Sequence, residues 1–180
     1  MLPIGQLMIE HRIIDRMVSL LKKESERAGS KEQININLIC VAVDFFKSYA
    51  DRCHHGKEED IMFKDLGTRP LSSEHKKMMA DLMQDHARAR ELIGKLETAK
   101  TGCQRENPDT VREIKECLKK LVDLYTSHIK KEDKQFFVSS MTYFTKNEQD
   151  EMLFRFEAFD RTLIHEKYKK LVEKAEKEYL

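Results

Sequence analysis

Six polar side chains interrupt the apolar stripes of a sequence that otherwise has the pattern of amphipathic helices. They are four histidines and two glutamates, His11, His54, Glu58, His86, His128 and Glu132. Each stands where a helical repeat of three and four calls for a hydrophobic residue. An unpartnered buried carboxylate is costly, and two on facing helices repel each other. A cation held between the six side chains would remove both costs.

The spacing of these residues suits a pair of metal ions. His54 with Glu58, and His128 with Glu132, are four residues apart, so each pair shares one helix face. Both pairs lie in the pattern H-x-x-K-E-[ED]-x-x-x-F, and His11 and His86 both lie in M-x-[ED]-H. The copies are 74 and 75 residues apart, which indicates a duplicated helical hairpin with matching ligands around a pseudo-twofold centre. Nitrogen and oxygen ligands without thiolate favour iron, then manganese, over structural zinc.

Four long helices are expected to carry these residues. Apolar residues recur with helical spacing in four segments, and 6 Gly and 3 Pro are too few for the turns of a β-sandwich or barrel. The segments run from Pro3 to Ala28-Gly29-Ser30, from Ile36 to about Leu66, from about Ser72 to Thr101-Gly102, and from Asn107 to about Met141. Short connections between them predict an all-α, antiparallel up-down-up-down four-helix bundle.

The expected antiparallel order places all six side chains in one layer. At 1.5 Å per residue from the common bundle end, His11, Glu58 and Glu132 lie about 12 to 14 Å deep. His54, His86 and His128 lie about 18 to 21 Å deep, roughly one turn further. The sequence therefore predicts a cavity lined by four imidazoles and two carboxylates.

A fifth segment follows the bundle. Thr145 and Glu148 have the spacing of a helical capping box, and we expect a helix from there towards Leu180, with a solvated tail of alternating Lys and Glu. We therefore predict a bundle over residues 1–142 and a C-terminal helical extension over residues 143–180, packed on the bundle or projecting from it.

Composition and charge disfavour several classes of protein. The formal net charge is +1, from 33 basic and 32 acidic residues, so we expect no nucleic-acid partner. No apolar stretch approaches the roughly 20 residues of a membrane span, and no signal-peptide pattern opens the chain, so we expect no membrane partner. The cysteines form no C-x-x-C pair, and we expect reduced, mostly buried thiols in a cytoplasmic protein. They are Cys40, Cys53, Cys103 and Cys117.

These motifs resemble the hemerythrin-like, or HHE cation-binding, family over about residues 5 to 140. The resemblance rests on four motifs in chain order, Glu10-His11, His54 to Phe63, Asp85-His86 and His128 to Asp133. It implies a four-helix bundle around a non-haem di-iron centre. The four histidines would be terminal ligands, Glu58 and Glu132 would be bridging carboxylates, and an oxo or hydroxo group would complete the bridge in the oxidised form.

The sequence departs from the oxygen-carrying members of that family in two ways. Those carriers have a fifth histidine ligand one turn away on the third helix, where this chain has Leu82 and Arg90. His55 or Glu59 could substitute only if the helix rotates or the cavity is wide, because adjacent residues lie about 100° apart, so a flanking role is favoured. Carriers also use an Asp five residues after the fourth-helix histidine. Asp133 has that spacing, but Glu132 is preferred because it repeats the geometry of Glu58.

Other polar residues have two possible roles each. Glu10 and Asp85 precede ligand histidines and either orient ligands of neighbouring helices or face solvent. Tyr49 and Tyr125 are expected to pack, with a hydrogen bond to a bound molecule as the alternative. His75 and His165 are expected at the surface.

The resemblance and the polar layer predict a site for a small diatomic molecule or peroxide. O2, peroxide or nitric oxide would bind or react there, for sensing, scavenging or detoxification, and whether the protein is an enzyme stays open. Apolar walls that limit solvent are expected from Ile14, Phe46, Leu82, Met83 and Leu124. The alternatives are a metal-responsive regulatory or structural module, or an iron donor in iron–sulfur cluster repair.

Overall fold

Every regular element in the described part of the chain is helical. The computed structural model describes residues 2–30, 34–103, 108–160 and 164–179, and it contains no strand there. The α-helices are α1 (Pro3–Ser30), α2 (Ile36–Phe45), α3 (Lys64–Leu66), α4 (Ser73–Cys103), α5 (Pro108–Lys131), α6 (Phe137–Ser140), α7 (Lys146–Phe159) and α8 (Ile164–Tyr179). The other helices of the described residues are the π-helices η1 (Phe46–His55), η2 (Glu58–Phe63) and η3 (Glu132–Phe136) and the 3₁₀ helix η4 (Met141–Tyr143).

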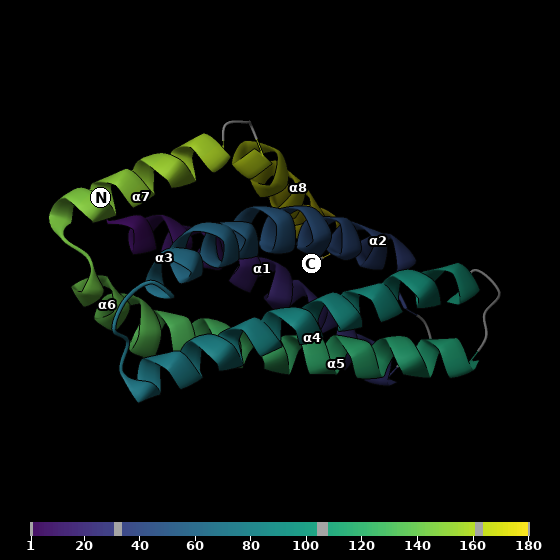
Figure 1. Cartoon of the computed structure of the whole chain (residues 1–180). Coiled ribbons are helices and arrows are strands. Elements are labelled where there is room, and N and C mark those ends of the chain that lie inside the picture. The colour runs from purple at the N-terminus through teal and green to yellow at the C-terminus, as the bar shows by residue number, and fades with distance from the viewer. Residues whose placement is uncertain (1, 31–33, 104–107, 161–163, 180) are drawn as a thin grey trace.

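The long helices lie lengthwise beside one another (Figure 1). α5 packs on both α1 and α4, and α2 with η1 packs on α4. The segment from α2 to α3 continues without interruption from Ile36 to Leu66, and a short turn at Gly67 leads to α4. The four helical segments predicted from the apolar spacing are confirmed, because each stripe is long enough to bury one face against its neighbours.

Two apolar clusters fill the interior, and the polar layer lies between them along the chain. One cluster contains Ile14 to Leu21 and the other contains Ile4 and Leu7, so His11 separates them on α1. The same order holds on the other three segments, where residues of the two clusters lie on either side of the predicted ligands. The prediction of a single polar layer within an apolar interior therefore agrees with the arrangement of the core.

Each π-helix of the described residues has one end at the polar layer. η1 ends at His55, η2 begins at Glu58, and η3 begins at Glu132. π-Helical turns are rare and are frequent at functional sites. They also depart from the 3.6-residue period, so the face on which a residue lies there does not follow from α-helical spacing.

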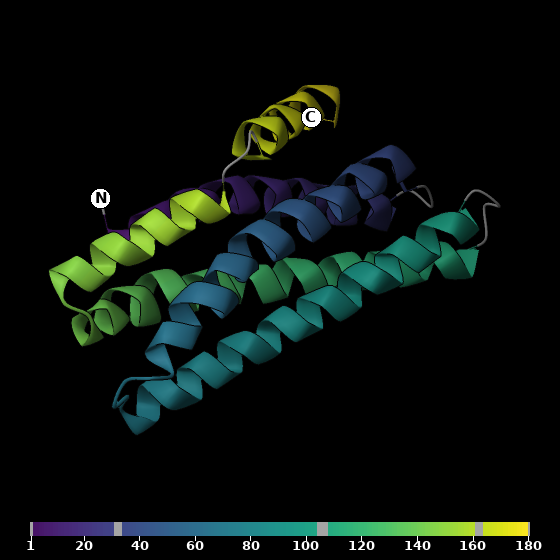
Figure 2. The same cartoon turned by 45° about the horizontal axis from the view of Figure 1, so that its top comes forward.

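The C-terminal segment forms two helices rather than the single predicted one. α7 begins with the capping box of Thr145 and Glu148, as predicted. α7 ends at Phe159 and α8 begins at Ile164, with residues 161–163 outside the described part. Figure 2 shows both helices on the side of α1 and α2, away from α4 and α5.

Side-chain contacts hold both C-terminal helices. Arg155 of α7 contacts Asp65 at 2.7 Å, and the Tyr168 hydroxyl of α8 donates to Asp44 at 2.9 Å. The ring of Phe159 also lies against Gly56, where an added Cβ would approach it to 2.8 Å. Glycine at this position therefore permits the close approach of α7 to η1.

One expectation about an individual side chain is wrong. Met83 is 46% exposed, so it is no wall of the polar layer. His75 and His165 are half-buried, and His75 contacts the Tyr143 hydroxyl. Cys53 and Cys117 are buried free thiols and Cys40 is exposed, in agreement with the expectation of mostly buried thiols, and the side chain of Cys103 lies outside the described residues.

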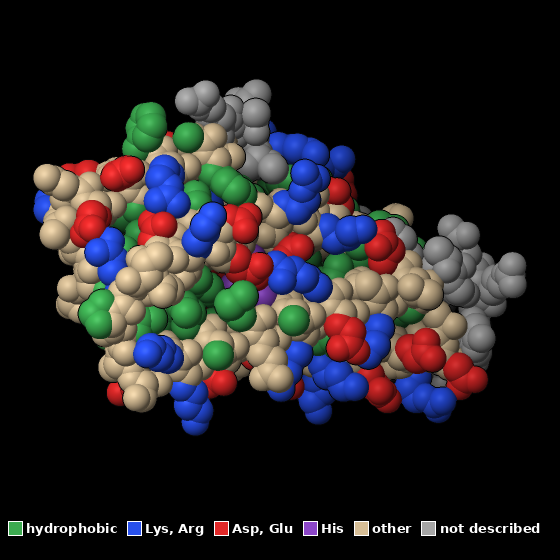
Figure 3. All heavy atoms as spheres, viewed as in Figure 1, with side chains coloured by type: hydrophobic (Ala, Val, Ile, Leu, Met, Phe, Trp, Pro, Cys, Tyr) green, Lys and Arg blue, Asp and Glu red, His purple; other side chains and the backbone are tan. Residues whose placement is uncertain are grey.

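The surface carries no long single-sign face in the view of Figure 3, where acidic and basic side chains alternate. Among the described residues, none of the helices is both long and apolar enough to cross a membrane.

Candidate metal centre

The structure brings the six predicted ligands together in two buried groups. One ligand atom from each of His11, His54, Glu58 and Glu132 lies within 4.8 Å of the others. A second group consists of His55, Glu58, His86 and His128 with the same spacing. All of these side chains are buried. Glu58 belongs to both groups, so the two groups are adjacent.

Both carboxylates reach imidazoles of both groups. Oε1 of Glu58 lies 3.4 Å from Nε2 of His54, and its Oε2 lies 3.4 Å from Nε2 of His86. Oε2 of Glu132 lies 3.2 Å from Nε2 of His11 and 3.1 Å from Nε2 of His128. Each glutamate thus has the position of a bridge between two centres.

The inward-facing atoms fit cations. Nε2 of His11 and His54, and all four oxygens of Glu58 and Glu132, are buried without a hydrogen-bond partner. Leaving such groups unpartnered costs about 1–3 kcal/mol each. Metal ions at the two groups would coordinate these atoms and remove that cost, and nitrogen with oxygen ligands suits iron.

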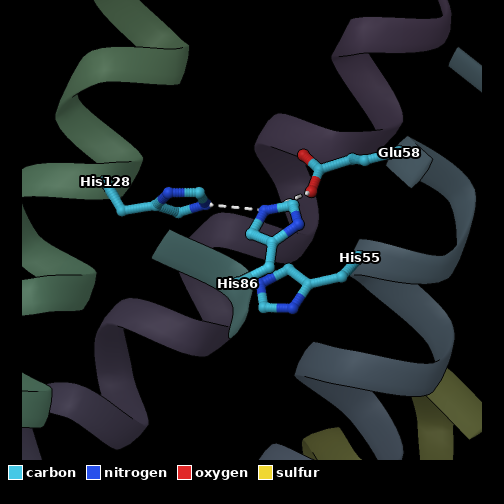
Figure 4. Close-up of side chains that lie close together, drawn as sticks. All are labelled: His55, Glu58, His86 and His128. Atoms are coloured by element: carbon cyan, nitrogen blue, oxygen red, sulfur yellow. Dashed lines mark hydrogen bonds and ion pairs between the residues drawn. The ribbon is translucent and has the colours of Figure 1, made fainter. Parts of the chain in front are cut away.

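His55 joins the second group, although the flanking role was favoured from sequence. Its ring stacks on that of His86, with centroids 3.8 Å apart and planes 11° apart. Figure 4 shows the ring of His86 between His55 and His128. Glu58 lies on the side of His55, opposite His128. His55 is the last residue of the π-helix η1, and this local widening lets two adjacent histidines face the interior.

Each predicted histidine ligand has an acidic side chain behind it. The outer ring nitrogen, Nδ1, faces a carboxylate, while Nε2 faces the centre. Three of these contacts are hydrogen bonds of 2.7 Å, those of His11 with Asp133, His54 with Glu10 and His86 with Glu59, whereas Nδ1 of His128 lies 3.6 Å from Asp85 and has no hydrogen-bond partner among the described residues. Metal-binding histidines usually have such a partner, which fixes the ring and its tautomer.

These contacts decide between roles left open by the sequence. Asp133 and Glu59 lie behind His11 and His86, outside the two ligand groups, so neither has the position of a substitute ligand. Glu10 is hydrogen-bonded to His54 of a neighbouring helix, and Asp85 lies 3.6 Å from His128 and accepts a hydrogen bond from Lys131, so neither carboxylate faces solvent alone. Tyr125 packs against His55, with ring centroids 6.3 Å apart.

The imidazoles differ in their affinity for protons. Burial lowers the pKa of His54 to about 4, against the opposing effect of Glu10. Burial and the neighbouring imidazoles also lower the pKa of His55 well below its usual value. For His128, burial is outweighed by Glu132 and Asp85, which raise the pKa to about 9. His54 and His55 are therefore neutral near pH 7, as metal ligation requires.

The two central carboxylates shift in opposite directions. Burial and the charge of Glu132 raise the pKa of Glu58 well above its usual value. Burial acts in the same sense on Glu132, but His128 and His11 outweigh it and hold the pKa of this carboxyl well below its usual value. Without a cation, Glu58 therefore holds a proton more readily than Glu132 does. Cation binding would displace that proton, because metals bind the carboxylate.

A buried lysine beside the centre was not predicted. Lys57 is fully buried, and its ammonium contacts Glu10, Asp160 and, at 3.8 Å, Sγ of Cys53. Cys53, Asp160 and His165 also have metal-ligand spacing, but the Lys57 ammonium already supplies a positive charge there. The x-x-K element of the repeated motif was the available signal, and lysine in a helix is ordinarily assigned to the surface.

Comparison with known proteins identifies a family. The family model described as hemerythrin HHE cation binding domain matches residues 2–138. Searches of curated proteins and of solved structures gave no match.

Proposed function

Because the chain belongs to the hemerythrin HHE cation-binding family, we propose that it binds two non-haem iron ions in the two ligand groups. The ligands are His11, His54, Glu58, His86, His128 and Glu132, with His55 added to the second group. The observation that carries this proposal is the position of Glu58 and Glu132, each of which reaches imidazoles of both groups. Cation binding itself is the property for which the family is named.

We further propose that the bound iron handles a small molecule, either O2, peroxide or nitric oxide. Reduced iron ions would supply electrons to such an oxidant. The protein's own residues hold three of the imidazoles in place through hydrogen bonds to the outer carboxylates Asp133, Glu10 and Glu59. Buried Ile14, Phe46 and Leu82 limit the access of water. This supports sensing, scavenging or detoxification in preference to a purely structural role.

The proposal includes the finer architecture and the location. Residues 1–142 would form an antiparallel up-down-up-down four-helix bundle, and residues 143–180 an extension on its α1–α2 side. The free thiols of Cys53 and Cys117 support a cytoplasmic protein. The balanced charge supports small molecules, rather than nucleic acid or membrane, as the partners.

Metal analysis with an optical spectrum tests the metal site. Aerobically purified protein is expected to hold two iron ions per chain, with oxo-bridge charge-transfer bands in the near ultraviolet. His54→Ala with His128→Ala should lose both the bands and the iron, and His55→Leu should reduce the iron bound to the second group. His75→Leu is the matched control, because His75 lies outside both groups. One zinc ion, or no metal after anaerobic iron loading, would refute the proposal.

Reaction of the reduced protein tests the small-molecule function separately. Rapid decay of the ferrous form with O2, peroxide or nitric oxide is expected, followed by absorbance in stopped flow. A ferrous form inert to all three would refute this function and leave the metal site intact.

A second candidate is a metal-responsive module, and one contact path favours it. Asp160, at the end of α7, contacts Lys57, and Lys57 contacts Glu10, which lies 2.7 Å from Nδ1 of His54. The C-terminal helices are therefore joined to a metal ligand through three side chains. Limited proteolysis of α7 and α8 should differ between iron-loaded and chelator-treated protein, and equal digestion rates would contradict this role.

A further inference from the structure

A groove opens between α4 and η1, beside the second ligand group. It encloses about 140 Å³. Its lining is mostly apolar on the inside and charged at the rim, and consists of Phe46, Lys47, Asp51, His55, Ala89, Arg90, Ile93, Gly94, Glu97 and Tyr125. The volume is close to that of an engineered cavity of roughly 150 Å³ that binds benzene. It therefore exceeds what a diatomic molecule needs.

Aromatic rings form part of the lining of the groove. Phe46 and Tyr125 supply aromatic rings whose centroids are 4.7 Å apart. Gly94 of α4 also lines the groove and has no side chain, and a Cβ added there would meet no atom within 4 Å. The His55 ring is parallel to that of Tyr125 within 11°, so a planar guest could stack in the same orientation.

The charges at the rim are paired with one another. Nε of Arg90 donates to Asp51 at 2.7 Å, and its Nη2 donates to Glu59 at 2.8 Å. The Lys47 ammonium lies 3.0 Å from Glu97. A charged guest would have to disrupt one of these ion pairs or enter without a partner, which is unfavourable in a mostly apolar space. The rim therefore selects against charge.

Three side chains separate the inner end of the groove from His86 and His128. His55, Ala89 and Tyr125 line both the groove and a tighter gap that is also lined by His86 and His128. A molecule in the groove would thus contact His55, a member of the second ligand group, and would lie one side chain from His86 and His128.

We propose that this groove is a binding site for a neutral, planar organic molecule of the size of benzene or phenol. The guest stacks near Tyr125 and Phe46, occupies the space left open by Gly94, and contacts His55 at its inner end. Binding depends on the groove alone, so this proposal does not rest on the function proposed for the metal ions.

Binding of 4-fluorophenol to the purified full-length protein tests the proposal. Fluorine NMR gives the Kd of the wild type and of two leucine variants on α4. Gly94→Leu fills the groove, and it is expected to fold because leucine favours a helix interior over glycine. Its Kd should rise at least about tenfold, which corresponds to about 1.4 kcal/mol. Lys95→Leu adds the same side chain at an exposed neighbouring position and should bind like the wild type.

A charged analogue of phenol and a variant with a smaller added side chain complete the test. 4-Fluorobenzoate should bind at least about tenfold more weakly than 4-fluorophenol, and Gly94→Ala should weaken phenol binding by an intermediate amount. Absence of phenol binding to the wild type at about 10 mM, equal binding by Gly94→Leu, or equal binding of benzoate would each overturn the proposal. None of these outcomes affects the iron content, which is measured separately.

Discussion

Replacement of Lys57 by methionine should strongly destabilise the protein. The side chain of Lys57 is 0% exposed, and its ammonium lies between two carboxylates that are themselves almost fully buried, Glu10 (2%) and Asp160 (7%). Burial lowers the pKa of Lys57, but Glu10 and its other partners outweigh this and raise the pKa above its usual value, so the group stays charged. Methionine keeps the unbranched shape but leaves both carboxylates without this cation.

The magnitude follows from the burial of the partners. Removing one member of a buried ion pair costs about 3–5 kcal/mol, because the remaining charge stays uncompensated. Glu10 keeps its contact with His54, and Asp160 keeps its contact with His165 at 2.9 Å. We therefore expect the lower end, about 3 kcal/mol. For a chain of this length this corresponds to a fall in Tm of about 6–12 °C.

The internal repeat supplies a matched control. Lys131 occupies the position of Lys57 in the second copy of the motif, and its ammonium lies 2.8 Å from Asp85. Its side chain is 28% exposed, so this pair should contribute no more than about 1 kcal/mol. Urea unfolding of Lys57→Met and Lys131→Met at equal, measured metal content compares the two. Similar losses in both variants, or a loss below about 1 kcal/mol for Lys57→Met, would refute the reasoning.

Two further predictions concern the C-terminal helices. Thr145→Ala removes the capping contact with the Glu148 backbone and should lower the free energy of unfolding by about 1 kcal/mol. Thr145→Ser should keep the contact and the stability. Thermal unfolding compares the two variants, and equal losses would contradict the role of the cap. For Asp160, burial raises the pKa, but His165, Cys53 and Lys57 outweigh it and hold the pKa at about 2. Because this value lies below that of the unfolded chain, the stabilisation is complete above about pH 4 and is lost as the pH falls through about 2. Asp160→Asn should therefore flatten the decline of stability between these pH values, and an unchanged slope would contradict the assignment.

The long helices and the polar layer could be predicted because both follow from periodic spacing. His11, His54, His86 and His128 interrupt strong apolar stripes, and the depths that follow from the α-helical rise, about 12 to 21 Å, place them in one layer that is one to two turns thick. The capping box at Thr145 could also be predicted, since it depends on two residues three positions apart. These features are local in the sequence, so a single chain reveals them.

The position of His55 could not be derived in the same way. The prediction assumed 3.6 residues per turn, whereas η1 and η2 are π-helical around this residue. The burial of Lys57 was equally hidden. It depends on Asp160, 103 residues away, and on how the C-terminal helices pack against α1 and η1. Long-range packing of this kind leaves no periodic signal.

The internal repeat explains both the symmetry and the asymmetry of the centre. Glu10 with His54 and Asp85 with His128 are equivalent contacts within each half, whereas Asp133 with His11 and Glu59 with His86 are equivalent contacts between halves. Each half therefore needs the other to orient one of its histidines.

The two copies of the motif differ immediately after the first histidine. The first copy has His55 there, and the second has Ile129, which is buried in the apolar core. His55 belongs to the second ligand group and also lines the groove beside α4, so the ligand pattern of the repeat breaks its symmetry at a residue that faces the groove. If iron fills both groups, the ion beside His55 is the one that a molecule in the groove would approach. The asymmetry of the repeat would then give the two metal positions different access to exchangeable ligands.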